Sequence, residues 1–196
     1  MRLFLVACLA LGACSGAESP PPPASPEQGG PADPGPDARP WQRMAARATE
    51  GRRRETERAL GVLDHGRRTT VEEMLDRMAR GGLGAAPLRE AGALAEANVG
   101  LAPDPEWAGS GTAPAPHALY VGGLAVIAGM AIASAEADPS SAPALADTLC
   151  EMPLPQHFNS GGREDDTSAR GALCRELLAS LPEGTPPPDA PCCRAL

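Results

Sequence analysis

A shortage of large apolar side chains is the feature that most limits what this chain can fold into. Leu, Ile, Val and Phe together account for 31 of the 196 residues, about 16%, whereas Ala alone accounts for 37. A share below roughly 20%, combined with a net charge of −8, is typical of chains that bury too little apolar surface to form a large core. We therefore expect the folded part to be small and to gain stability from covalent cross-links.

Charge and length exclude two classes of protein. The sequence pI is near 4.9, and every one of the 17 basic residues is Arg. A nucleic-acid-binding protein needs a basic face, so we expect no nucleic-acid partner. The charge is also uneven, at +2 over residues 40–100 and −8 over residues 101–196. The chain is too short for a large multidomain enzyme.

The N-terminus has the organisation of a secretory signal peptide. Arg2 precedes an apolar run from Leu3 to Leu11, and small residues follow this run. The nine apolar positions would rise only about 14 Å as a helix, which is too short to span a membrane. We therefore predict that residues 1–13 are a cleaved signal peptide.

The end of this segment reads Leu11-Gly12-Ala13-Cys14. It resembles the lipobox of bacterial lipoproteins, in which the cysteine thiol is acylated and the cysteine becomes the new N-terminus. Cys8 ends a similar run of letters, but only five residues separate it from Arg2, so Cys14 is the predicted lipidation site. The alternative is an ordinary signal peptide that contains an incidental cysteine.

The resemblance implies a location as well as an anchor. Membrane attachment would come from the N-terminal lipid, whose buried CH₂ groups contribute about 0.8 kcal/mol each. In lipoproteins of bacteria with two membranes, Asp directly after the cysteine usually retains the protein at the inner membrane, and here that position is Ser15. We therefore expect a cell-envelope protein anchored at the outer membrane and facing the periplasm or the cell surface.

Residues 14–39 are predicted to be the lipidated cysteine and a disordered Pro-rich linker. Residues 15–39 contain no Val, Ile, Leu, Met or aromatic residue, and Pro20 to Pro23 form a polyproline stretch. At about 3.1 Å per residue, such a segment reaches up to about 75 Å. A helical domain over residues 40–182 and a Cys-containing tail over 183–196, too Pro-rich for structure of its own, complete the predicted organisation.

Within the body, the hydrophobic patterning predicts helices and no convincing strand, and therefore a mainly α, small irregular bundle with a disulfide-linked C-terminal region. The Pro-rich residues 101–116 are predicted to be a loop that divides the domain. The first predicted helix runs from Trp41 to Leu63, and the second starts at a Thr70–Glu73 capping box, carries Val71, Met74, Leu75 and Met78 on one face and ends at Gly81-Gly82. A third helix contains Leu88, Ala91, Leu94 and Ala95 and continues to Gly100, and a short helix with Leu145 and Leu149 ends near Met152. The last predicted helix is capped by Asp166-Thr167-Ser168, carries Leu173, Leu177, Leu178 and Leu181 on one face and ends at Pro182.

The most apolar stretch after the signal runs over residues 117–137, and Leu119 to Ala135 contains no charge. Its length is near the lower limit for a membrane span, and its flanks carry no Arg cluster that would orient it. Gly122, Gly123 and Gly129 would let neighbouring segments pack closely. A central buried helix is therefore favoured over a membrane span.

The cysteines that remain after removal of the signal and acylation of Cys14 are Cys150, Cys174, Cys192 and Cys193. An even number of cysteines in an exported chain predicts two disulfides. Of the three possible pairings, one forces the adjacent tail cysteines into a strained vicinal bond. The other two tie the tail to the two preceding helices and are preferred, and the choice between them stays open.

The same residue types allow a zinc site as an alternative, built from Cys150, His157, Cys174 and one tail cysteine. The spacings match no compact ligand motif, and an exported chain favours oxidation of its cysteines. A redox-active pair is not indicated either, because the sequence has no C-x-x-C. We therefore predict disulfides, with no metal and no cofactor.

No motif points to catalysis. The sequence has no G-x-S-x-G, H-E-x-x-H or P-loop, and nothing fixes His65 or His157 within reach of a nucleophile. We therefore predict a lipid-anchored envelope protein, not an enzyme and without a catalytic residue, that has a structural role or binds an envelope protein partner. The alternative is an envelope lipoprotein that binds a small ligand or metal, and an envelope hydrolase is the third interpretation.

Overall fold

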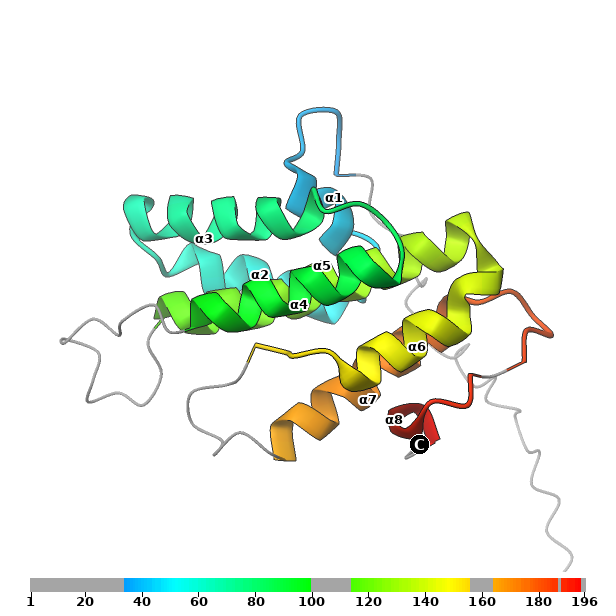
Figure 1. Cartoon of the computed structure of the whole chain (residues 1–196). Coiled ribbons are helices and arrows are strands. Elements are labelled where there is room, and N and C mark those ends of the chain that lie inside the picture. The colour runs from blue at the N-terminus through cyan, green and yellow to red at the C-terminus, as the bar shows by residue number, and fades with distance from the viewer. Residues whose placement is uncertain (1–33, 100–113, 156–163, 187, 195–196) are drawn as a thin grey trace, which may run out of the picture. The chain divides into compact units, whose positions relative to one another are not determined.

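The computed structural model describes residues 34–99, 114–155, 164–186 and 188–194, without the side chains of Val99 and residues 164–168. The predicted signal peptide, Cys14, most of the linker and His157 lie outside these residues. All regular secondary structure in the described ranges is helical (Figure 1). The predicted mainly α fold is therefore confirmed.

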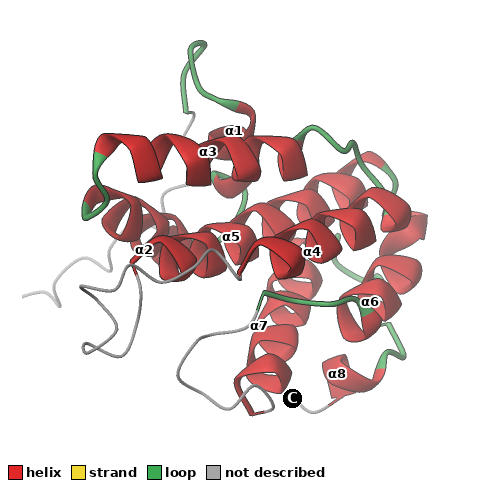
Figure 2. Cartoon of the chain, turned by 60° about the vertical axis from the view of Figure 1, so that its left-hand side comes forward, coloured by secondary structure: helices red, strands yellow, loops and turns green. Residues whose placement is uncertain are grey.

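The described helices follow one another as α1 (Pro40–Ala45), α2 (Glu50–Gly61), α3 (His65–Ala79), α4 (Ala85–Val99), α5 (Pro114–Ala137), the 3-10 turn η2 (Pro139–Ser141), α6 (Ala142–Glu151), α7 (Glu164–Ser180) and α8 (Pro191–Arg194). Helices α1 to α4 all pack against α5. Figure 2 shows α6, α7 and α8 grouped together, and these three helices contact one another.

Helix α5 lies at the centre of the domain. It contacts α1, α2, α3, α4, α6 and α7, and every residue from Ala118 to Ala135 except Tyr120 is buried. Within the described chain it is the one helix long and apolar enough to cross a membrane, yet 94% of its most apolar window is buried inside the domain. The structure therefore contains the central buried helix that the sequence favoured.

Two glycines let neighbouring segments approach α5 closely. A Cβ atom on Gly129 would lie 1.8 Å from the carbonyl oxygen of Met44 in α1, and one on Gly122 would lie 2.8 Å from Cδ1 of Leu75 in α3. A Cβ atom on Gly123 would have ordinary room, with its nearest neighbour 3.5 Å away. The predicted close packing is therefore present at Gly129 and Gly122 and is not required at Gly123.

Helix α3 begins earlier than the sequence predicts. Asp64 is its N-cap, and the Asp64 carboxylate accepts a hydrogen bond from the backbone N–H of Arg67 at 3.0 Å. Thr70 lies inside the helix, where its hydroxyl donates to the carbonyl of Gly66 at 3.1 Å. The predicted start at Thr70 is therefore wrong: Asp64, which is also a good capping residue, caps the helix about one and a half turns earlier. The predicted apolar stripe of this helix does face the core.

The boundaries of two other predicted helices also change. The segment from Trp41 to Leu63 forms α1 and α2, and Thr49 caps α2 by accepting from the backbone N–H of Arg52 at 3.4 Å. Helix α7 is helical from Glu164, so residues 166–168 lie in its first turns rather than at its cap. The apolar face of α7 was predictable and does pack in the core, whereas the points at which the chain enters α1, α2 and α7 were not.

The last residue of the predicted linker is attached to the helical domain. The guanidinium of Arg39 donates to Asp76 at 2.9 and 2.7 Å and to Glu72 at 2.6 Å, and both carboxylates belong to α3. Burial opposes the charge on Arg39, but hydrogen bonding and attraction to Asp76 and Glu72 outweigh it and raise the Arg39 pKa. Asp76 also accepts the backbone N–H of Trp41 at 3.2 Å. The folded domain therefore includes Arg39.

The predicted division near residues 101–116 does not separate two cores. Residues 100–113 lie outside the described chain, and Pro114 and Pro116 belong to the start of α5. Helices α3 and α4, which precede this segment, pack on α5, which follows it. The described buried residues on both sides belong to one hydrophobic cluster.

Candidate functional site

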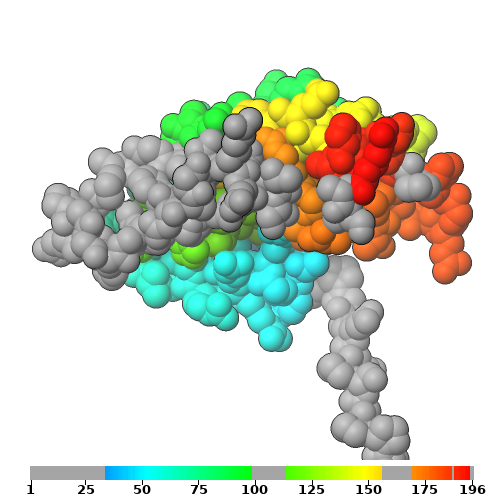
Figure 3. All heavy atoms as spheres, turned by 90° about the horizontal axis from the view of Figure 1, so that it is seen from below, coloured from blue at the N-terminus to red at the C-terminus, as the bar shows by residue number. Residues whose placement is uncertain are grey.

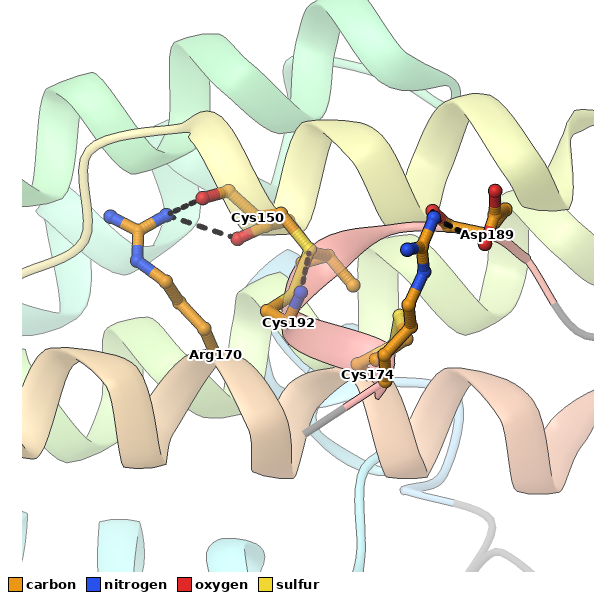
Figure 4. Close-up of a disulfide and its surroundings, with 8 residues drawn as sticks. Cys150, Arg170, Cys174, Asp189 and Cys192 are labelled. Carbon is orange, nitrogen blue, oxygen red and sulfur yellow. Dashed lines mark hydrogen bonds and ion pairs between the residues drawn. A yellow bond between two sulfur atoms is a disulfide. The ribbon is translucent and has the colours of Figure 1, made fainter. Parts of the chain in front are cut away.

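The four C-terminal cysteines come together where α6, α7 and α8 meet. Cys150 lies in the last turn of α6, Cys174 lies in α7 and Cys192 lies in α8 (Figure 4). Cys193 follows Cys192 directly in α8. Cys150 is bonded to Cys192 and Cys174 to Cys193, with Cα–Cα distances of 5.5 and 5.6 Å. The structure therefore has one of the two preferred non-vicinal pairings. We call the Cys150–Cys192 bond the outer disulfide and the Cys174–Cys193 bond the inner disulfide.

The local sequence explains why these helices present their cysteines to one another. Leu145 and Leu149 of α6 and Leu173 and Leu177 of α7 are fully buried, and the two helices pack together. Cys174 follows Leu173 directly, so it borders the same apolar face. The apolar patterning of α6 and α7 therefore turns both cysteines toward the core that the two helices share.

The tail has structure of its own, contrary to the prediction from its proline content. Its residues 191–194 form α8, Ala190 is fully buried, and Cys193 is 8% exposed. Figure 3 shows the described end of the chain lying against α6 and α7. The prediction failed because it considered local propensity alone, whereas two cross-links and buried side chains fix this segment to the domain.

The two disulfides differ in exposure. Cys174 is 0% exposed and Cys193 is 8% exposed, so the inner disulfide belongs to the hydrophobic core. Cys150 and Cys192 are half-buried and pack against the edge of that core. A reagent in solvent therefore has access to the outer disulfide before the inner one.

Polar groups surround the outer disulfide. Arg170 of α7 donates to the backbone carbonyls of Leu149 and Cys150 at 3.1 and 2.7 Å, which satisfies acceptors at the end of α6. The backbone N–H of Cys192 donates to Sγ of Cys150 at 3.2 Å (Figure 4). The N–H donor therefore lies at the sulfur of Cys150, whereas the positive charge of Arg170 lies at the backbone carbonyls of Leu149 and Cys150.

Three sulfur atoms of the cluster form a tight group. The Sγ atoms of Cys150, Cys192 and Cys193 all lie within 4.8 Å of one another, whereas the Sγ of Cys174 is not part of this group. Sulfur atoms this close can exchange disulfide partners, and as thiolates they are the ligand type that zinc and other soft metals prefer. The geometry thus permits both disulfide chemistry and metal binding after reduction.

The other predicted candidates are not brought to this cluster in the part of the chain that the structure describes. His65 is the exposed first residue of α3, and His157 and Cys14 lie outside the described residues. The zinc alternative built on His157 is therefore not tested. The three cysteines that it would use, Cys150, Cys174 and one tail cysteine, are all in disulfides instead.

An open groove of about 250 Å³ lies between α2, α5 and α7. Its lining combines apolar and charged side chains: Arg52, Glu55, Tyr120, Val121, Leu124, Ala169 and Ala172. A second pocket of about 230 Å³ lies beside α1 and α2 and includes Trp41, Gln42, Arg53 and Glu57 in its lining. Among the residues whose side chains the structure describes, the linings of both pockets consist of apolar side chains, Arg, Glu and the polar side chains of Tyr120 and Gln42.

Charged contacts around the groove include one that the sequence did not reveal. Arg52 of α2 forms an ion pair with Glu176 of α7, whose side chains are 16% and 11% exposed. Their separation of 124 positions leaves no local signal, because helical spacing rules indicate only partners three or four residues apart. Local pairs of this kind do occur within α2. The hydrogen bond that Arg53 donates to Glu50, followed in size of effect by the one from Arg54, lowers the pKa of the Glu50 carboxyl.

Comparison of the chain with models of known protein families, with curated proteins and with solved structures found no match.

Proposed function

We propose that this chain is a lipid-anchored protein of the bacterial cell envelope and that its helical domain binds a protein partner there. The observation that carries the proposal is the pair of disulfides joining α6, α7 and α8. Disulfides persist in oxidising compartments such as the periplasm and are rare in the cytosol. They support an exported chain, in agreement with the signal-like N-terminus.

The burial of α5 supports attachment through the N-terminus. Helix α5 is surrounded by other helices, so lifting it into a bilayer would expose the apolar faces that now cover it. The lipobox-like segment ending at Cys14 offers an anchor that leaves the domain intact. An acylated Cys14 followed by an extended linker would hold the domain at a distance from the membrane.

The groove between α2, α5 and α7 is the surface we assign to the partner. It places Val121 and Leu124 beside the charged side chains of Arg52 and Glu55. Apolar contacts bordered by charges are typical of protein interfaces. The groove is open, and its described lining combines apolar and charged side chains, which supports a protein segment as its ligand.

Replacement of Cys14 tests the anchor directly. The Cys14→Ser variant should leave the membrane pellet after an alkaline wash, because it retains the linker and domain but has no thiol to acylate. The matched control is Cys8→Ser, which changes the same residue type in the same segment and should remain in the pellet. If Cys14→Ser still pellets with membranes, the lipid-anchor proposal is wrong and α5 becomes the candidate span.

The proximity of three cysteine sulfurs favours a second candidate function, which is the binding of a soft metal ion. Binding requires thiolates, so it competes with the two disulfides. Metal analysis of protein purified without reductant separates the two candidates. Stoichiometric metal that a chelator removes would support the second candidate, whereas a metal-free protein without free thiols supports the first.

A further inference from the structure

The cysteine cluster combines two disulfides of unequal exposure with three sulfurs within 4.8 Å of one another. We propose that it is a thiol–disulfide exchange site, at which a low-molecular-weight thiol becomes attached to Cys192 and a free thiol appears on Cys174 in the core. The proposal concerns a site of covalent modification, and it does not depend on the lipid anchor.

The first step takes place at the outer disulfide. A thiolate from solvent attacks Sγ of Cys192, a new S–S bond forms, and the bond between Cys192 and Cys150 breaks with its electron pair going to Cys150. Cys150 is the better leaving group, because the Cys192 N–H lies 3.2 Å from its Sγ. A hydrogen-bond donor at the sulfur favours its charged form and so stabilises the thiolate that leaves.

The second step takes place at the inner disulfide, in the core. The Cys150 thiolate attacks Sγ of Cys193, which lies within 4.8 Å, and the bond between Cys193 and Cys174 breaks. Cys193 is the sulfur attacked, because Cys174 lies outside the group of three. Cys174 leaves as a thiolate and takes up a proton.

The two steps balance without an oxidant or a reductant. The external thiol loses one proton and Cys174 gains one. Two disulfides are present before the reaction, Cys150–Cys192 and Cys174–Cys193. Two are present afterwards, one between Cys192 and the thiol and one between Cys150 and Cys193. The free thiol has therefore moved from solvent to a residue that is 0% exposed.

The wild-type protein gives the direct test, with 2-mercaptoethanol as the probe. The mature chain is incubated with a small excess of this thiol, quenched with acid, alkylated in denaturant and mapped by mass spectrometry without reduction. We expect the adduct on Cys192, a Cys150–Cys193 peptide pair and the alkyl group on Cys174. An alkylated Cys150 beside an intact inner disulfide would overturn the proposal, and so would the absence of any adduct.

Two matched variants test the role of Cys193 separately. Cys174→Ser and Cys193→Ser remove the same inner disulfide and leave one thiol each, so both lose the same cross-link. In Cys174→Ser, the remaining Cys193 should exchange with the outer disulfide, and alkylation should label both Cys192 and Cys193. In Cys193→Ser, only Cys174 should be labelled. Labelling confined to Cys193 in the first variant would contradict exchange within the cluster.

Discussion

Gly129 shows how little space the centre of this domain leaves for a side chain. The carbonyl of Met44 occupies the position that a Cβ atom would need, at a distance of 1.8 Å. Because the atom in the way belongs to the backbone, the contact cannot be relieved by a change of rotamer. A chain poor in large apolar side chains thus packs its centre by bringing backbones together, with Ala and Gly between them.

We predict that Gly129→Ala destabilises the domain by about 1–3 kcal/mol or more, as overpacking of a filled core does. Gly51→Ala is the matched control, since the same methyl group in α2 would meet nothing within 4 Å and should stabilise the helix by up to about 1 kcal/mol. Urea denaturation of both variants measures the difference. Equal stabilities for the two variants would contradict the close approach of α1 to α5.

At the residue scale, the sequence predicted side-chain burial better than it predicted caps. The apolar residues of α3 and α7 could be identified from their spacing because helical periodicity fixes which of them share a face. The start of α3 could not, because Asp64 and Thr70 are both good capping residues. Tertiary packing, which a single sequence does not show, decides between them.

At the scale of elements, one helix organises the others. Helix α5 contacts α1 to α4 as well as α6 and α7, and its apolar character extends around its whole circumference, as expected for a helix buried on all sides. Its burial was predictable from the absence of charge between Leu119 and Ala135. The groove beside it was not, because α2, α5 and α7 are far apart in the sequence.

That groove gives a prediction about the partner. Ala172 is half-buried in the lining of the groove, so Ala172→Arg places a long charged side chain where the partner would lie. When the proteins cross-linked to the chain in cells are quantified by mass spectrometry, we expect the variant to recover about tenfold less partner than the wild type. This factor corresponds to about 1.4 kcal/mol of binding free energy. The control is Ala93→Arg, at an exposed position of α4, which should recover the same proteins as the wild type. Unchanged recovery with both variants would remove the groove from the proposal.

At the scale of the whole molecule, cross-links complement a small core. Each disulfide stabilises a domain by about 2–4 kcal/mol, and the two bonds close segments with separations of 42 and 19 positions. They also fix the tail, whose proline content gave no indication of order. The need for cross-links followed from composition, but the choice between the two non-vicinal pairings did not, because spacing alone does not determine disulfide connectivity.

The central claim is that the chain is exported, acylated at Cys14 and oxidised at its four remaining cysteines. Intact-mass spectrometry of the mature protein, extracted with detergent and without reductant, tests all three parts together. The predicted mass is that of residues 14–196 carrying acyl chains, and it lies four hydrogen atoms below the mass after full reduction, because two disulfides are present. A chain that begins at another residue, or one whose mass does not change on reduction, would contradict the account.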